Sequence, residues 1–117
     1  MSYVDGFVLP VPKKNLAAYK RMASKGRKIW MKCGALQYFE CVGDDLDVPW
    51  GLPFPKGIRS KAGETIVFSF IVYKSKAHRD AVNKKVMSDP AMNTPPKKMP
   101  FDMKRMLYGG VKTIVEG

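Results

Sequence analysis

Several features are missing from this sequence, and each absence excludes a class of protein. No run of about 18 apolar residues is present, so no membrane-spanning helix is expected. The first residues show neither a basic nor a long apolar segment, which argues against a signal peptide and for a cytoplasmic protein. The two cysteines, Cys33 and Cys41, match neither zinc-site nor disulfide-framework spacing, and Cys41 is expected to be an inert core thiol. We therefore expect reduced thiols, no metal site and no cofactor.

Common catalytic and nucleotide-binding motifs are missing as well. The sequence shows no Ser-His-Asp order, no P-loop and no GxGxxG motif. Its single histidine, His78, lies in the first turn of a predicted helix, where the helix dipole disfavours imidazolium. His78 is therefore either a neutral base or hydrogen-bond donor, or simply a surface residue that caps the helix. No motif identifies a reaction.

Positive charge, in contrast, is abundant. The 117 residues include 21 Lys and Arg against 10 Asp and Glu, a formal net charge of +11. Because 45% of the residues are hydrophobic, the chain can form one folded domain, residues 1–117. Eight basic and no acidic residues lie between residues 13 and 32. Five of them share one face of a predicted helix: Lys14, Arg21, Lys25, Lys28 and Lys32.

This basic face has two interpretations. It is either a solvated surface that favours solubility, or an anion- or RNA-binding surface that attracts phosphates. The stacking aromatic pair and the GXXG loop of common RNA-binding modules are missing from the sequence. Nucleic acid is therefore the less supported partner, and a membrane is not expected to be one.

Residue patterning predicts four strands and two helices. The helices are expected over residues 13–31, with Asn15 as N-cap, and between Ser75 and Asp89, with Ser75 as N-cap. Strands are expected at residues 3–11, 35–43, 64–73 and 106–115. The order β-α-β-β-α-β predicts an α+β, ferredoxin-like fold: an antiparallel sheet with both helices on one face.

Glycine and proline positions define the predicted breaks. Gly26 weakens the first helix by up to about 1 kcal/mol relative to Ala, so a break near it is one possibility. Pro10 and Pro12 are expected to end the first strand. Long loops are predicted for residues 44–63 and for the Pro- and Met-rich segment 90–100.

The alternation of the third strand predicts which face of the sheet the helices cover. Ile66, Phe68, Phe70 and Val72 form a wholly apolar row, which we expect under the helices. The opposite face is then left uncovered, and its expected side chains are Tyr3, Asp5, Phe7, Leu9, Tyr38, Glu40, Thr65, Val67, Ser69, Ile71, Tyr73, Met106, Tyr108, Gly110 and Lys112. Such a face is too apolar to stay bare, which predicts either a homodimer interface or a small-molecule cleft.

Four segments in order along the chain carry a family resemblance: MSYVDGFVLPVP (1–12), GALQYFECVGDD (34–45), VYKSKAHRD (72–80) and PFDMKRMLYGG (100–110). Together they resemble the YbaA-like family of small bacterial proteins, whose function is unknown. The resemblance implies a ferredoxin-like subunit of a dimeric α+β barrel. That superfamily includes heme-degrading and antibiotic-biosynthesis monooxygenases, but the family itself supplies no catalytic residue.

A small-molecule-binding homodimer is therefore the first functional hypothesis, with a cofactor-free enzyme of monooxygenase type as one form of it. The candidate cleft residues are Asp5, Tyr38, Glu40, His78, Asp102, Arg105 and Tyr108. Arg105 is expected either to bind a carboxylate or phosphate in the cleft, or to pair locally with Asp102. The alternatives are an RNA- or anion-binding module that uses the basic helix, and a purely structural dimer.

Overall fold

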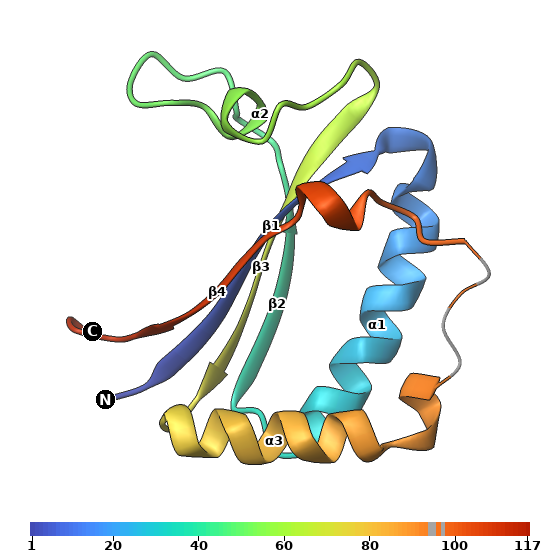
Figure 1. Cartoon of the computed structure of the whole chain (residues 1–117). Coiled ribbons are helices and arrows are strands. Elements are labelled where there is room, and N and C mark those ends of the chain that lie inside the picture. The colour runs from blue at the N-terminus through green and yellow to red at the C-terminus, as the bar shows by residue number, and fades with distance from the viewer. Residues whose placement is uncertain (94–95, 97) are drawn as a thin grey trace.

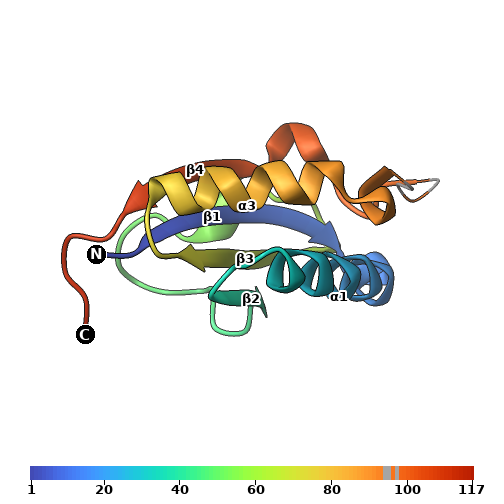
Figure 2. The ribbon, with the colours of Figure 1, turned by 90° about the horizontal axis from the view of Figure 1, so that it is seen from below.

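A four-stranded antiparallel sheet and two long helices form an α+β fold, shown in Figure 1. The computed structural model describes residues 1–93, 96 and 98–117. The strands are β1 (Tyr3–Pro12), β2 (Gln37–Val42), β3 (Glu64–Tyr73) and β4 (Leu107–Lys112), in the spatial order β2-β3-β1-β4 that Figure 2 shows from below. The helices are α1 (Leu16–Lys32), the one-turn α2 (Phe54–Gly57) and α3 (Lys76–Ser88), with 3-10 turns at Lys13–Asn15, Pro90–Asn93 and Met103–Arg105. This architecture is compatible with the predicted ferredoxin-like fold.

The strand boundaries agree best where the sequence pattern is strongest. The prediction of β3 at residues 64–73 is confirmed, whereas β2 and β4 are shorter than predicted. Pro12 is the last residue of β1, as predicted, whereas Pro10 lies inside the strand and does not end it. β4 pairs only with Tyr3–Val8, so one edge of β1 has no partner strand beyond Val8. Proline, which lacks a backbone N–H group, is tolerated at such an edge.

A neighbouring side chain caps the N-terminus of α3, whereas the N-cap residue of α1 contacts a distant segment of the chain. Ser75 caps α3 as predicted, since its Oγ accepts a hydrogen bond from the His78 N–H at 3.1 Å. Asn15 occupies the N-cap position of α1, but its side chain donates to the Pro100 carbonyl at 3.2 Å instead. The one-turn α2 was not predicted within the loop 44–63. Within the predicted loop 90–100, residues 94, 95 and 97 lie outside the described residues.

Gly26 does not break α1, which is continuous from Leu16 to Lys32. A Cβ atom at this position would lie only 3.3 Å from the Tyr38 hydroxyl oxygen of β2. Gly26 therefore serves a close approach between α1 and β2, which outweighs its intrinsic helix cost.

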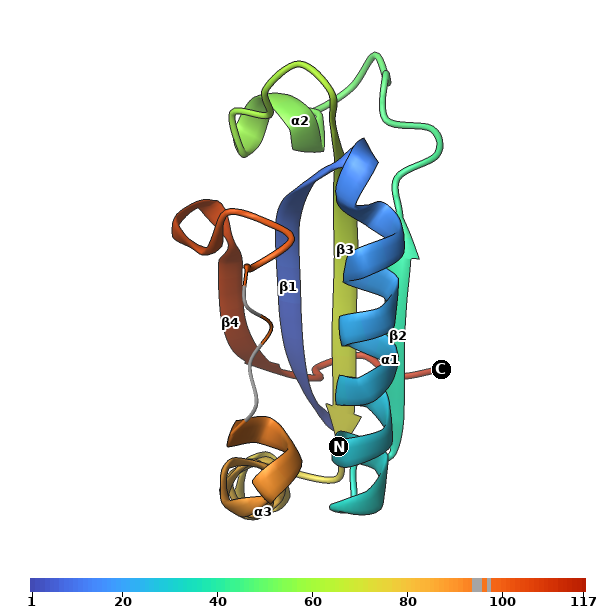
Figure 3. The same cartoon turned by 90° about the vertical axis from the view of Figure 1, so that its right-hand side faces the viewer.

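The helices cover the face of the sheet opposite to the predicted one. Val67, Ile71 and Tyr73 of β3 belong to the two core clusters, together with helix residues such as Tyr19, Ala23, Ile29, Val82 and Val86. Figure 3, seen from the helix side, shows α1 lying over β3 and β2. The prediction that Ile66, Phe68, Phe70 and Val72 lie under the helices is therefore wrong. Both rows of β3 side chains are largely apolar. The row with Tyr73 can lie under the helices because its polar atoms have hydrogen-bond partners there: the Tyr73 hydroxyl donates to Asn83 Oδ1 at 3.3 Å.

The other face of the sheet is apolar and largely uncovered. We define the uncovered face, from the strand register, as Val4, Val8, Phe39, Cys41, Phe68, Phe70, Val72, Leu107 and Val111. Phe39 stacks on Phe70 with ring centroids 4.8 Å apart, yet Phe39 and Phe68 are exposed. Cys41 is exposed, which contradicts the predicted core thiol. Figure 1 shows the loop that carries α2 and the C-terminal end projecting from this same side of the sheet.

Candidate functional site

The side chains predicted to form one cleft lie in separate groups. The strand register places Asp5, Tyr38, Glu40 and Tyr108 on the helix-covered face of the sheet, not on the uncovered one. Glu40 and Tyr38 lie beside α1, Asp5 and Tyr108 contact α3, and Arg105 precedes β4. Each group has its own geometry, and Tyr38 and Glu40 border a sizeable cavity.

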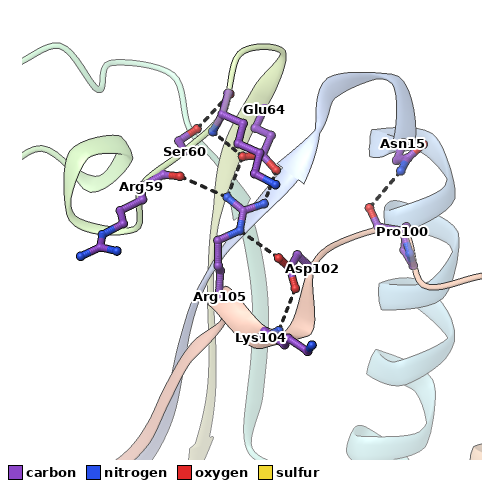
Figure 4. A network of polar contacts seen from close by, with 9 residues as sticks. Asn15, Arg59, Ser60, Glu64, Pro100, Asp102, Lys104 and Arg105 are labelled. Carbon is purple, nitrogen blue, oxygen red and sulfur yellow. Dashed lines mark hydrogen bonds and ion pairs between the residues drawn. The ribbon is translucent and has the colours of Figure 1, made fainter.

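Arg105 is the centre of an ion-pair network that joins the start of β3 to the turn before β4 (Figure 4). Its two terminal nitrogens donate to the Glu64 carboxylate at 2.6 and 2.9 Å, and its Nε donates to Asp102 at 3.0 Å. The Arg59 carbonyl accepts a further hydrogen bond at 3.2 Å. The predicted local pair with Asp102 is therefore present, and all three guanidinium nitrogens are engaged within the chain. The bidentate pair with Glu64 fixes the fold here.

The same network predicts a pH dependence of stability. Hydrogen bonds from Arg105 lower the pKa of Glu64. The pair therefore contributes stability above the unfolded-state pKa of about 4.3, and this contribution is lost as the pH falls through the lower folded-state value. We expect Glu64→Gln to reduce the free energy of unfolding most at about pH 6 and progressively less below about pH 4. Urea unfolding of both proteins across this range measures the difference, and a deficit that does not change with pH would contradict it.

Asp5 forms a second closed network, and its partner is Arg79 of α3, not Arg105. The Asp5 side chain is almost fully buried and accepts a hydrogen bond from Arg79 Nη1 at 2.7 Å. The Arg79 guanidinium also lies over the Tyr3 ring, 5.0 Å from its centroid, and donates to the Tyr108 hydroxyl at 3.4 Å. A Cβ atom at Gly110 would come within 2.5 Å of the Tyr3 hydroxyl, so this packing requires glycine there. The network satisfies a buried charge and joins β1, β4 and α3.

The contacts of His78 are those of a residue that caps a helix, the second of the two roles predicted for it. Its Nδ1 accepts a hydrogen bond from the Lys74 backbone N–H at 2.9 Å, and its ring packs edge-on against Tyr73. An Nδ1 that accepts a hydrogen bond leaves the proton of the neutral ring on Nε2. His78 thus stabilises the start of α3 and does not line the cavity described next.

The cavity lies between α1 and the strands β2 and β3, and its volume is about 450 Å³. We call it the α1–β2 cleft. Its lining consists of Leu16, Tyr19, Lys20, Ala23, Ser24, Arg27, Tyr38, Glu40, Cys41, Val42 and Val67. Ala23 and Ser24 are small residues on α1, and the helix therefore leaves space next to the sheet at this point. The cleft combines apolar walls with a few polar groups, as small-molecule sites do.

Glu40 is the central polar group of the α1–β2 cleft. Tyr19 donates its hydroxyl to Glu40 Oε1 at 2.6 Å, and Tyr38 donates to Oε2 at 2.7 Å. Burial, together with the neighbouring Glu40 carboxylate, raises the pKa of both tyrosines. Both hydroxyls therefore remain protonated donors, and each carboxylate oxygen keeps acceptor capacity for a ligand.

Two residues that line this cleft were predicted from the sequence, but for a cleft on the face of the sheet opposite to the helices. Tyr38 and Glu40 were selected because they are two residues apart in one strand and thus share a face. Tyr19, Lys20 and Arg27 are not among the residues predicted for the cleft. Lys20 is three residues before Ala23 and Arg27 is four residues after it, and this helical spacing places them beside the site.

The predicted anion-binding residues lie on the outer surface of α1 and of the 3-10 turn that precedes it. Lys14, Arg21, Lys25, Lys28 and Lys32 are all exposed. Arg21, Lys25 and Lys28 border a second, more open depression that shares Lys20 and Ser24 with the α1–β2 cleft. Anion binding by this surface stays a prediction.

The part of the chain that the structure describes comprises residues 1–93, 96 and 98–117. No group of three or more His, Cys, Asp or Glu side chains in that part could hold a metal ion. No helix of that part has the length and apolar character needed to cross a bilayer.

Comparison with known proteins places the chain in a family. Residues 2–103 match the family described as "Protein of unknown function (DUF1428)". "Uncharacterized protein YbaA" of Escherichia coli (strain K12) and that of Shigella flexneri are each 43% identical over 116 residues, covering 99% of both chains. Among solved structures, "De novo designed protein Foldit4" aligns over 99% of this chain and 100% of its own, with a TM-score of 0.40 and 12% identity, a likeness too low to support an argument. This chain therefore belongs to the DUF1428 family and is similar over nearly its whole length to the YbaA proteins.

Proposed function

We propose that this protein binds a small molecule in the α1–β2 cleft. The observation that carries the proposal is the Glu40 carboxylate, held between the hydroxyls of Tyr19 and Tyr38 beside a cavity of about 450 Å³. Leu16, Ala23 and Val67 give the cleft apolar walls that would contact the body of a ligand. The cleft is thus on the helix-covered side of the sheet, and the earlier candidates Tyr38 and Glu40 are its members.

An enzymatic role extends this proposal. A cofactor-free reaction of monooxygenase type would begin with removal of a proton from the bound molecule. Glu40 is the acidic side chain in the cleft, and the hydrogen bonds of Tyr19 and Tyr38 fix its orientation.

Filling the cleft from its mouth is expected to abolish ligand binding. Ser24 is exposed and lines the cleft, so Ser24→Phe projects a ring toward the cavity without altering the core. A library of small neutral and charged fragments, screened by NMR, should perturb amide resonances of residues 16–27 and 37–42 in the wild type but not in Ser24→Phe.

Ala17→Phe is the matched control, because Ala17 is an exposed residue of α1 that borders only the second depression. This variant should retain the wild-type perturbations. A library that leaves these residues unperturbed in the wild-type protein contradicts the proposed function.

We also propose that the protein is a homodimer assembled through its uncovered face, as in a dimeric α+β barrel. Two observations support this. The face is apolar across all four strands, and Trp50 and Leu52 in the loop after β2 are 82% and 72% exposed. Large exposed apolar surfaces of this kind mark interaction sites. If the cleft binds no ligand, the remaining alternative is a homodimer with a purely structural role.

Anion or RNA binding by α1 is the second candidate function. The exposed Lys14, Arg21, Lys25, Lys28 and Lys32 favour it, and α1 carries no acidic residue. Attraction of a phosphate backbone by such a surface would weaken steeply with salt, whereas a ligand in a half-buried cleft would be screened less. Salt dependence therefore separates the two candidates.

A further inference from the structure

We propose that the α1–β2 cleft selects small organic acids that also carry a hydroxyl group, with the carboxylate at the mouth and the hydroxyl against Glu40. This inference rests on the proposed function and adds the chemical class and orientation of the ligand. It follows from the different charges at the two ends of the cleft.

The mouth of the cleft carries two basic side chains without partners. Lys20 and Arg27 are exposed residues of α1 that line the cleft, and neither forms an ion pair or hydrogen bond with the described residues. The other arginines described above, Arg79 and Arg105, are each held by carboxylates of the chain. The Arg27 guanidinium is thus available to bind a carboxylate through two parallel hydrogen bonds, with Lys20 adding a second positive charge.

The inner polar groups of the cleft offer acceptors and no free donors. Tyr19 and Tyr38 each have one O–H group, and both are used on Glu40. The Glu40 carboxylate has accepted one bond on each oxygen and retains further lone pairs. A ligand end that reaches Glu40 must therefore donate a hydrogen bond, and a second carboxylate there would be repelled.

The space between the two ends suits an apolar body. Leu16, Ala23, Val42 and Val67 supply apolar walls of the cleft. A charged mouth, apolar walls and an acceptor at the inner end describe a hydroxylated carboxylic acid with a compact hydrocarbon or aromatic body. A ligand that lacks either polar group leaves one end of the site without its partner, which costs about 10-fold in affinity.

A panel of three classes of probe tests each end of the site separately. The first is 4-hydroxybenzoate, with 4-hydroxyphenylacetate and 3-(4-hydroxyphenyl)propionate as longer homologues that vary the distance between the two groups. The second is benzoate with its matching homologues, which lack the hydroxyl. The third is phenol, which lacks the carboxylate. NMR titrations of the full chain should show one of the hydroxy acids binding about 10-fold more tightly than phenol and than its own hydroxyl-free analogue.

Variants then assign each effect to a residue. Arg27→Gln should weaken the hydroxy acid and its hydroxyl-free analogue about 10-fold and leave phenol unchanged. Glu40→Gln should weaken the hydroxy acid and phenol but not the hydroxyl-free acid. Arg21→Gln is the matched control, because it removes the same charge from an exposed site of α1 that does not line the cleft.

The outcomes separate the ligand class from the proposed function. If phenol and the hydroxy acids bind the cleft equally well and Arg27→Gln changes neither, the ligand class is wrong while the proposed function stands. If Arg21→Gln weakens the acids as much as Arg27→Gln does, general charge attraction replaces the specific site and the inference is overturned. If neither this panel nor the fragment library perturbs the cleft, both proposals fail.

Discussion

Replacing Arg79 with Met is expected to reduce the free energy of unfolding by about 3–5 kcal/mol. Asp5, its partner, is 2% exposed, and the two side chains approach to 2.7 Å. Met retains much of the apolar stem that packs over Tyr3 but cannot neutralise the carboxylate. Since small domains have only about 5–15 kcal/mol of net stability, this loss would be a large part of the total.

Urea unfolding at neutral pH measures this effect, and two controls isolate it. Lys32→Met removes the basic partner of the Lys32–Asp89 pair, in which the lysine side chain is 76% exposed, so little change is expected. The double variant Asp5→Val with Arg79→Met removes both charges and should recover much of the lost stability, because an apolar pair leaves no buried charge without a partner. A single Arg79→Met variant within about 1 kcal/mol of the wild type would show that Asp5 does not depend on Arg79.

The fold was predictable where local pattern and tertiary structure agree. The β-branched and aromatic run of β3 and the N-cap Ser75 were identified from neighbouring residues alone. The covered face was not, because both rows of β3 are apolar and alternation cannot then select one. The row that contains Ser69 and Tyr73 is the more polar of the two, yet both of these residues are buried. Hydrogen-bond partners on another element, such as Asn83 of α3, make that possible.

The candidate site was predictable only in part for a similar reason. Tyr38 and Glu40 are neighbours on one strand face, which the sequence reveals. Arg105 and Glu64 are 41 residues apart, and Arg79 and Asp5 are 74 apart, so spacing gives no indication of either pair. Both arginines have structural partners, so the predicted ligand-binding residue Arg105 is held by carboxylates of the chain. Arg27, which has no such partner among the described residues, becomes the candidate instead.

Two lysines on the uncovered face are expected to convert a dimer into a monomer. Phe68 and Val111 are 41% and 59% exposed and belong to strands β3 and β4 of that face. Stable interfaces bury about 800 Å² per partner and exclude unpaired charge from their centres. Phe68→Lys with Val111→Lys should therefore weaken association by more than about 100-fold, because each buried ammonium group would lack a partner. Light scattering after size-exclusion chromatography at micromolar concentrations measures the mass.

A matched double variant distinguishes loss of the interface from a general effect of charge. Met31→Lys with Met87→Lys also replaces two exposed apolar residues, but these lie on α1 and α3, on the other side of the sheet. It should remain a dimer, and circular dichroism should show native secondary structure in both double variants. A wild-type protein that is monomeric at these concentrations would contradict assembly through the uncovered face. The α1–β2 cleft would be unaffected by that result, because its lining comes from α1, β2 and β3 of a single chain.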